Sequence, residues 1–379
     1  MKKFALVFWA TVFIAQAGCS DKKNPVSADN DMNGLKSWVA QTSGTMNALH
    51  AVHFLNAAEG WAAGDNSTLL RTTNSGANWS AVSAGLPDSR DIKSVRFIDA
   101  NSGWIAGPYF VGRTLNGGAN WGGLLYQQSP EEFRTKVFPL SSSQAWAVGK
   151  TTLGTFNARA FWRYTYNSTG TRSTFSIGQS SSDIVNDVYF VDADNGWSVG
   201  TFGRIIRVTS ASADQPVLTI QTSGTNEDLN CIHMLDPNTG WVAGAKGTIL
   251  TTTNGGATWT AQTSAVTVDL RAVSFADAKH GLAVGEAGTI LYTTDGGASW
   301  ATQNSNVTHS LRRVHFVDAN TAYVVGDNGT ILKATTSGAA LAKEAPRANR
   351  RSAPAKDYSI PSAVASEWLP APSSEKSNR

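Results

Sequence analysis

One position of a segment that recurs seven times carries mostly basic or amide side chains. It is the residue just after the first apolar residue of each copy, and its occupants are His50, Lys93, Arg134, Asn186, Asn230, Arg271 and Arg312, with Arg313 next to the last. None of them is acidic. A guanidinium can donate two parallel hydrogen bonds to a carboxylate, so the row suits recognition of an acidic partner better than catalysis. The alternative, that polar residues simply end strands, stays open.

The repeated segment combines Leu-x-x-Val-x-Phe with Gly-Trp-x-x-Gly and Gly-Thr-Ile-Leu-x-Thr-Thr. The residue at its Trp position is Trp61, Trp104, Trp146, Trp197, Trp241, Leu282 and Tyr323 in turn, at intervals of 41–51 residues. A period of roughly 40–45 residues with four short β segments is typical of a β-propeller blade. The sequence therefore predicts an all-β fold, a seven-bladed β-propeller.

Each copy should supply four strands, but the seventh copy lacks its fourth. The expected strands of the first copy are 49–54, 61–64, 68–73 and a fourth that begins at Trp79. Short apolar runs bounded by Gly, Asn and Asp are the basis for this division. Residues 37–43 match residues 259–264, a fourth strand elsewhere. We therefore expect the N-terminal strand to complete the last blade and close the ring, which removes exposed sheet edges.

In a propeller the basic row would lie near the axis on one face. Arg204, in a turn between second and third strands, should lie on that same face. Turns on the opposite face carry Asp99, Asp192, Asp236, Asp277 and Asp318, which either form an acidic rim or simply cap the turns. Three histidines are expected to line the channel or to contact neighbouring blades, namely His53, His233 and His315. A basic mouth opposite an acidic rim would orient an acidic partner.

Four copies of Thr-x-Asn/Asp-x-Gly-x-x-Trp join third and fourth strands. They occupy residues 72–79, 114–121, 252–259 and 293–300. The Asn or Asp can cap turn amides, the Gly accommodates a positive φ, and the Trp packs against a neighbouring strand. This is the Asp-box, or BNR repeat, and we interpret it as a folding motif without a chemical role.

With its Gly-Trp-x-x-Gly and Gly-Thr-Ile-Leu segments, the repeat resembles the photosystem II assembly/stability factor family of BNR-like propellers. In photosynthetic members, this resemblance implies a non-enzymatic seven-bladed scaffold in the lumen that holds a membrane-protein assembly intermediate. Similar repeats also occur in exported bacterial proteins with no photosynthetic role. Nothing in the sequence indicates photosynthesis, so the resemblance implies a scaffold here.

BNR propellers also include sialidases, so an exported glycan-binding or glycan-cleaving propeller is the alternative. A sialidase needs a three-Arg clamp, a Tyr nucleophile with a nearby Glu, and an acid/base Asp. Glu59, Glu227 and Glu286 lie in different loop types without an evident Tyr partner, although the many turn aspartates leave a carboxylate pair open. No His/Cys cluster has zinc spacing and no phosphate loop occurs. We therefore expect no enzymatic activity, no cofactor and no metal.

The N-terminus resembles a lipoprotein signal peptide. Two lysines precede an apolar stretch, too short for an ordinary transmembrane helix, that ends near the candidate lipobox residue Cys19. Gln16 departs from the lipobox pattern, and ordinary cleavage after Ala17 is the alternative. Lipidation of Cys19 would anchor the protein in a membrane. Ser20 favours the outer membrane, and the alternative is a soluble periplasmic or secreted protein.

Composition changes divide the chain into four segments. They are a signal peptide (1–19), a polar tether (20–36), the propeller (37–336) and a disordered basic tail rich in Pro, Ala and Ser (337–379). The net charge of +3 is small, so no nucleic-acid partner is expected. If Cys19 is lipidated, Cys231 is the one remaining thiol and no intramolecular disulfide can form.

The resulting hypothesis is a monomeric, envelope-anchored scaffold that binds a protein partner through its basic face. Its function would be to support assembly or stability of a membrane or envelope complex. The candidate partner-binding residues are His50, Lys93, Arg134, Arg204, Arg271, Arg312 and Arg313.

Overall fold

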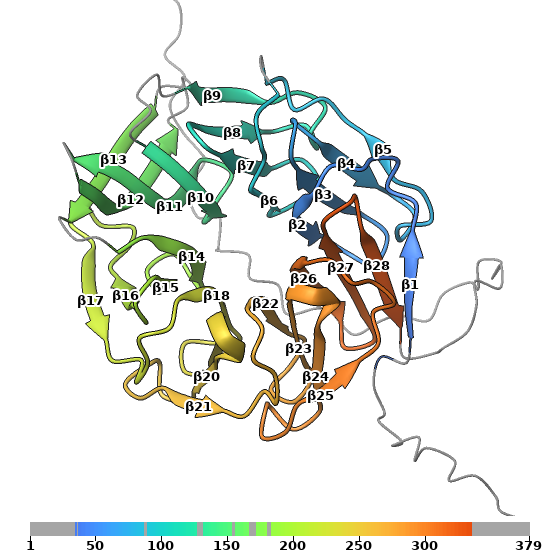
Figure 1. Cartoon of the computed structure of the whole chain (residues 1–379). Helices are drawn as coiled ribbons and strands as arrows, with labels where there is room; N and C mark the ends of the chain where they lie inside the picture. Colours follow the sequence, from blue (N-terminus) through green and yellow to red (C-terminus); the bar gives the residue numbers. More distant parts are fainter. Residues whose placement is uncertain are drawn as a thin grey trace, which may run out of the picture. The chain divides into compact units, whose positions relative to one another are not determined.

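The computed structural model of the protein describes residue 35 and residues 37–86, 89–126, 132–153, 156–166, 172–179 and 183–335. These residues form seven four-stranded antiparallel sheets around a central axis (Figure 1). Cavities between their first strands lie along this axis, and we call this space the channel. The prediction of a seven-bladed β-propeller is thereby confirmed. No helix in the described residues is long and apolar enough to cross a membrane. The expected signal peptide, nearly all of the tether and the tail lie outside the described residues.

The blades are numbered 1–7 in chain order, and the first strand of each lies at the channel (Figure 1). Blades 1 and 2 are β2 (Leu49–Phe54), β3 (Gly60–Gly64), β4 (Leu69–Thr72) and β5 (Ser80–Ala81), then β6 (Ser94–Phe97), β7 (Gly103–Gly107), β8 (Phe110–Thr114) and β9 (Gly122–Tyr126). Blades 3 and 4 are β10 (Glu132–Pro139), β11 (Gln144–Leu153), β12 (Phe156–Tyr166) and β13 (Arg172–Gln179), then β14 (Val185–Phe190), β15 (Gly196–Gly200), β16 (Ile205–Thr209) and β17 (Val217–Gln221).

The remaining blades follow the same plan. Blades 5 and 6 are β18 (Leu229–Met234), β19 (Gly240–Gly244), β20 (Ile249–Thr252) and β21 (Thr260–Gln262), then β22 (Leu270–Phe275), β23 (Gly281–Gly285), β24 (Ile290–Thr293) and β25 (Ala301–Gln303). Blade 7 is β26 (Leu311–Asp318), β27 (Thr321–Gly326), β28 (Ile331–Thr335) and β1 (Ser37–Gln41). Two short 3-10 turns, η1 (Ala245–Gly247) and η2 (Glu286–Gly288), join second and third strands in blades 5 and 6.

The ring closes as predicted, with the N-terminal strand in the last blade. β1 pairs antiparallel with β28, and Trp38 lies opposite Ala334. The Trp38 side chain is buried, and its Nε1 donates to Gln303 Oε1 of blade 6 over 2.9 Å. β1 therefore supplies both the outer strand of blade 7 and one aromatic side chain of the core.

Aromatic side chains fill the wedges between blades. Trp61 on β3 is fully buried and stacks on Phe97 of blade 2, with ring centroids 3.6 Å apart. Tyr323 takes the Trp position in blade 7 and stacks on Phe54 of blade 1 at 3.9 Å. The Gly-Trp motif of the sequence is thus a packing element that joins consecutive blades.

The Asp-box turn is a hydrogen-bonded unit, as the copy in blade 5 illustrates. Thr252 Oγ1 donates to Asn254 Oδ1 (3.0 Å) and accepts from the N–H of Gly256 (2.9 Å). Asn254 Oδ1 also accepts from the N–H of Thr258 (2.9 Å). Gly256 has a φ of +85°, a conformation that strains residues with a Cβ. The same bonds recur in blades 1, 2 and 6, which supports the interpretation as a folding motif.

A second set of hydrogen bonds joins neighbouring blades at the rim. At four blade junctions, the indole N–H of a Trp donates to the side-chain oxygen of a Gln on the outer strand of the preceding blade. The pairs are Trp38–Gln303, Trp79–Gln41, Trp259–Gln221 and Trp300–Gln262. In blade 1, Val82 occupies the position of this Gln. The Val82 N–H donates to the Leu69 carbonyl, and Gln262 lies opposite Ile249 at the equivalent position of blade 5. Trp121 of blade 2 accordingly has a buried Nε1 without a hydrogen-bond partner.

A β-bulge at the start of the first strands positions the candidate site. In blade 6, Leu270 pairs with Gly285 and Ala272 with Val284, so Arg271 is the extra residue between them. The same register step occurs at His50, Asn186, Asn230 and Arg312. A bulge re-aims the side chain of the extra residue, and in these blades it places that residue at the channel mouth.

Candidate partner-binding site

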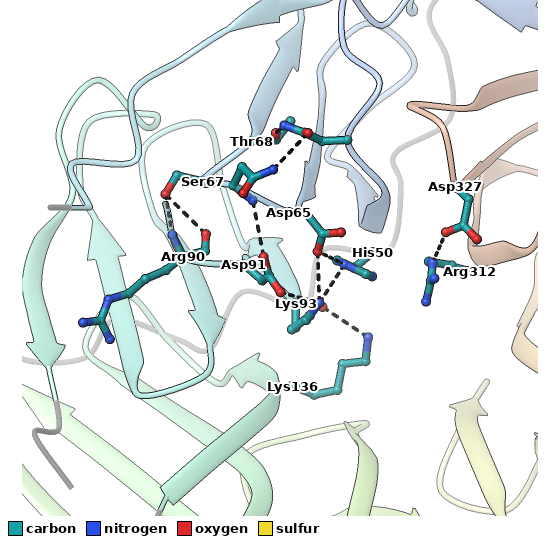
Figure 2. A network of polar contacts seen from close by, with 12 residues as sticks. His50, Asp65, Ser67, Thr68, Arg90, Asp91, Lys93, Lys136, Arg312 and Asp327 are labelled. Carbon is teal, nitrogen blue, oxygen red and sulfur yellow. Dashed lines mark hydrogen bonds and ion pairs between the residues drawn. The ribbon is translucent and has the colours of Figure 1, made fainter. Parts of the chain in front are cut away.

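The bulged residues surround one end of the channel, which we call the basic mouth. It holds a cavity of about 280 Å³ lined by His50, Lys93, Lys136, Asn186, Asn230, Arg271 and Arg312. Figure 2 shows that His50, Lys93, Lys136 and Arg312 approach this end from different blades. The structure thus brings together His50, Lys93, Arg271 and Arg312 from the predicted set.

Carboxylates also lie at the basic mouth, although the sequence analysis placed none there. Lys93 Nζ lies 3.1 Å from Asp65 Oδ1 and 3.0 Å from Asp91 Oδ2, and His50 Nε2 lies 2.5 Å from Asp65 Oδ1 (Figure 2). Burial lowers the pKa of His50, and Lys93 acts in the same direction against the opposing effect of Asp65. Burial alone would raise the pKa of Asp65, but its bonds to His50 and Lys93 hold that pKa below its ordinary value. His50 is therefore mainly neutral at pH 7, and Asp65 is ionised.

Arg271 and Arg312 form ion pairs within their own blades. The Arg312 guanidinium contacts Asp327 (Figure 2), and the Arg271 guanidinium contacts Glu286, with Asp269 3.7 Å away. Both arginine side chains are more than a third exposed, so solvent screens these pairs and each contributes about 0–1 kcal/mol to stability. Such weakly held guanidiniums can exchange a side-chain partner for a ligand carboxylate at little cost.

Arg204 lies on the same side of the propeller but does not line the basic mouth. It follows the turn between β15 and β16, and its Nε donates to Asp183 Oδ2 over 2.8 Å. The Asp183 side chain is almost fully buried. Arg204 therefore holds the segment that leads into β14, and its predicted contact with a partner stays a prediction.

The predicted position of Arg134 is wrong by one residue. Arg134 pairs with Gly149, the register of the apolar residue that precedes the bulge in other blades, and the bulged residue is Thr135. The cause lies at the end of β10. Pro139 takes the register position that Phe or Met occupies in the other first strands. The preceding residue, Phe138, was mistaken for that aromatic residue.

Arg313 lies inside the channel, which contradicts its predicted place on the basic face. Its side chain is 14% exposed, and its Nη1 donates to Asp187 Oδ2 over 3.0 Å. This ion pair joins blade 7 to blade 4. Burial alone would raise the pKa of Asp187, but the Arg313 charge outweighs it and holds that pKa below its ordinary value. Burial raises the pKa of Cys231, 3.2 Å from Arg313, to about 11, so the thiol is neutral.

A second cavity, of about 140 Å³, lies in the channel. The three histidines that the sequence analysis placed at the channel line it, namely His53, His233 and His315. Burial, aided by the Arg96 charge, lowers the pKa of His233 to about 3 and that of His315 to about 4. Burial and His315 hold the pKa of His53 well below its ordinary value. All three imidazoles are therefore neutral at pH 7.

Two cations of the channel wall, Arg96 and Lys136, were missed by the sequence analysis. Arg96 lies three residues after the bulge position, like His53. Lys136 pairs with Val148 just after the bulge of blade 3. Counting back from the Gly-Trp-x-x-Gly strand, rather than forward from the first apolar residue, identifies both positions. The register error at Arg134 hid Lys136 in particular.

The aspartates of the opposite turns cap backbone amides. Asp99 Oδ1 accepts hydrogen bonds from the N–H groups of Asn101 (2.8 Å) and Ser102 (2.6 Å). Asp192, Asp236, Asp277 and Asp318 accept equivalent bonds. Turn capping accounts for these residues without a binding role.

The described residues contain no group of three or more His, Cys, Asp or Glu side chains placed to hold a metal ion. Asp187 is the one carboxylate among the described residues that line the two cavities. The geometry at the channel therefore suits binding of an anionic group.

Comparison with known proteins identifies one matching family model. A family model described as "Photosynthesis system II assembly factor YCF48" matches residues 30–153, 209–304 and 262–335. No curated protein matches the chain.

Solved structures share the fold. One described as "YCF48 bound to D1 peptide" has a TM-score of 0.64 at 20% identity and covers 80% of this chain and 98% of its own. A second, YCF48 from Cyanidioschyzon merolae, has a TM-score of 0.65 at 19% identity over 79% and 99% of the two chains. The WD40 propeller domain of Doa1 has a TM-score of 0.61 at 9% identity, over 80% and 97%.

Proposed function

The chain belongs to the Photosynthesis system II assembly factor YCF48 family, and we propose that it is a binding propeller without a catalytic step. In this proposal the basic mouth captures an acidic segment of a protein partner. The captured protein is held during assembly of a membrane or envelope complex, so the propeller acts as a scaffold.

The observation that carries the proposal is the convergence of cationic side chains from separate blades on one cavity. Lys93, Lys136, Arg271 and Arg312 line the basic mouth together. Lys93, Arg271 and Arg312 form ion pairs. Those of the two arginines are screened by solvent, and a competing carboxylate can replace them. Because the strands of a closed ring hold these side chains in place, binding requires little ordering of the protein.

A peptide segment is a suitable occupant for a site of this kind. One YCF48 structure that shares the fold is bound to a D1 peptide. For this chain, we infer an extended acidic segment whose carboxylates replace Glu286 and Asp327 as partners of Arg271 and Arg312. Such contacts would set the association rate and its dependence on salt.

The proposed location is the cell envelope, with a lipid on Cys19 as the anchor. A tethered propeller would meet membrane proteins during their assembly. Replacing Cys19 by Ala should release the folded protein from membranes, as measured by fractionation and circular dichroism. A native N-terminus at Gly18 would instead establish a soluble exported protein.

The basic-mouth proposal is tested by partner capture with matched variants of the full chain. Arg271→Gln and Arg312→Gln each remove one charge from the mouth, whereas Lys279→Gln removes one charge from an exposed turn on the opposite side. Captured proteins from solubilised membranes are quantified by mass spectrometry. We expect the two mouth variants to lose the partner and Lys279→Gln to retain it. Equal capture by all three would overturn the proposal.

Raised salt provides an independent test of the same contacts. The wild-type interaction should weaken as sodium chloride increases, because exposed charges are screened over about 8–10 Å at 0.1–0.15 M ionic strength. The variant Arg271→Gln should show a shallower salt dependence than Lys279→Gln. A salt-independent interaction would place the partner elsewhere on the propeller.

A further inference from the structure

Arg96 is a channel cation without a polar partner in the part of the chain that the structure describes. It extends from β6, and its guanidinium carbon lies 4.1 Å from the ring centroid of Phe138 and 5.2 Å from that of Tyr189. These rings belong to blades 3 and 4 and stabilise the cation through their faces. Arg96 forms no hydrogen bond or ion pair with the described residues, and it lines the channel cavity.

Lys136 is the second such cation. It lines both the channel cavity and the basic mouth. Its Nζ donates to the backbone carbonyl of Lys93 over 3.4 Å (Figure 2), and it forms no ion pair with the described residues. Burial, followed by the Arg313 charge, lowers the pKa of Lys136 to about 8, so most of the population stays charged at pH 7.

The other groups of the channel do not neutralise these two charges. Asp187 is the one carboxylate among the described residues of the cavity wall, and Arg313 already pairs with it. The channel histidines are neutral, and burial raises the pKa of Tyr189, so its hydroxyl is neutral too. The described wall therefore carries an excess of two positive charges. Both side chains are half-buried, and a charge that is partly removed from water without a counter-charge is costly.

Neutral donors complete the surroundings of Arg96 and Lys136. Tyr189 and His233 line the same cavity, with ring centroids 5.1 Å apart. Neither the Tyr189 hydroxyl nor the His233 imidazole forms a hydrogen bond with a described residue. Each can donate one hydrogen bond to a ligand oxygen. The cavity thus combines two cations with two uncommitted donors.

We propose that the channel cavity binds one small inorganic dianion, sulfate or hydrogen phosphate, between Arg96 and Lys136. A single dianion balances the excess of two charges. The cavity of about 140 Å³ exceeds the roughly 30 Å³ that one water molecule occupies in the liquid, so it has room for a tetrahedral ion and some water. Lys136 lines both cavities, which marks the basic mouth as the route of entry.

The bound dianion would link blades 2 and 3, which contribute the two cations, to blades 4 and 5, which contribute Tyr189 and His233. A monovalent anion such as chloride or acetate balances only one of the two charges and should bind more weakly. Lys136 also lines the basic mouth, whereas Arg96 lines the channel cavity alone, so Arg96→Gln tests this site separately from partner capture.

Isothermal titration calorimetry of the full chain with sodium sulfate tests this inference, with sodium chloride at equal ionic strength as the reference. We expect one sulfate per chain. Arg96→Gln and Lys136→Met should each weaken binding by about tenfold or more, which corresponds to losing one hydrogen bond from a charged donor. The exposed Lys279→Gln variant serves as the control and should bind like the wild type. Equal heats for sulfate and chloride, or equal binding by Arg96→Gln and Lys279→Gln, would overturn the proposal.

Crystals of the wild-type protein soaked in selenate provide a second measurement that needs no variant. The anomalous signal of selenium should form one peak in the channel between Arg96 and Lys136. An empty channel at a selenate concentration that saturates the calorimetric binding would contradict the assignment. Peaks confined to the outer surface would contradict it equally.

Discussion

The rim of this propeller, formed by the outer strands and the Asp-box turns, repeats the same contacts from blade to blade, whereas the residues along the channel vary. At the rim, four blade junctions share one Trp–Gln hydrogen bond, and four Asp-box turns share one set of bonds. Along the channel, the residue three places after the bulge differs from blade to blade: His53, Arg96, Phe138, Tyr189, His233, Ser274 and His315.

The difference separates residues that hold the fold from residues that are free to bind. A position filled by the same residue in blade after blade meets the same packing demand each time, as Trp61 does against Phe97. The channel positions share no common packing contact. Some of them carry a charged side chain that is partly removed from water, which costs stability. We therefore expect substitutions at the rim to affect stability, and substitutions at the basic mouth or in the channel to affect binding.

The largest effect should follow from loss of the closing aromatic residue. Trp38→Ala removes a buried indole and its bond to Gln303, and should lower the free energy of unfolding by about 3–5 kcal/mol. Val39 on the same strand is 57% exposed, so Val39→Ala should change it by less than about 0.5 kcal/mol. Urea titrations measure both. Equal losses would show that closure does not depend on the indole.

Acid should weaken the channel by a comparable amount. The folded-state pKa values of His233 and His315, about 3 and 4, lie below the ordinary value of 6.5. The unfolded chain therefore gains protons first, so this stability is complete above pH 6.5 and is lost as the pH falls toward 4. At about 1.4 kcal/mol per pH unit for each histidine, the two should contribute about 3 kcal/mol less at pH 5.5 than at pH 7.5.

His233→Gln isolates half of that acid sensitivity. The variant removes one titrating group from the channel wall and leaves His315 in place. Urea titrations at pH 7.5 and pH 5.5 should therefore give a smaller difference for the variant, by about 1.4 kcal/mol. An unchanged difference would mean that His233 is not held neutral by burial.

A single Asp-box hydroxyl should have a moderate effect. Thr252→Val keeps the shape of the side chain but leaves the buried N–H of Gly256 without its acceptor. The free energy of unfolding should fall by about 1–3 kcal/mol, as measured by thermal or urea unfolding. Thr260→Val, at an exposed position of β21, is the matched control and should have little effect. A loss in the control as large as in the variant would remove the special role of the turn.

Blade 1 lacks the Gln of the Trp–Gln bond, and restoring it should stabilise the protein. Val82→Gln places an amide where the other blades have one, beside the unpaired Nε1 of Trp121. A new Trp–Gln bond should raise the free energy of unfolding by about 0.5–1.5 kcal/mol. No gain would show that the blade 1–2 junction differs in geometry as well as in sequence.

The sequence was sufficient for the parts of the molecule that repeat. Blade number, the strand β2 from Leu49 to Phe54 and closure by β1 were all predicted, because each depends on spacing and pattern. Residues that depart from the pattern were harder to place. Pro139 at the end of β10 shifted the apparent register, so Arg134 was placed in the basic row, at the position that Thr135 occupies in the structure.

Partners across the channel were also beyond the reach of the sequence. Arg313 was expected at the surface, yet it pairs with Asp187, which is 126 residues away and on a facing blade. No local sequence pattern predicts an ion pair between residues so far apart in the chain. The carboxylates of the basic mouth were also missed. Asp65 was not singled out, and Glu286 was considered only as a possible sialidase glutamate, yet they contact His50 and Arg271.

The most direct test of the account compares one variant of the basic mouth with one variant of the rim. The basic-mouth variant should change stability least. Arg312→Gln and Thr252→Val are compared for partner capture and for urea unfolding at one temperature where both are folded. We predict that Arg312→Gln loses capture while its free energy of unfolding changes by less than about 1 kcal/mol, and that Thr252→Val loses stability but retains capture. If capture instead follows stability in both variants, the basic mouth is not the binding site.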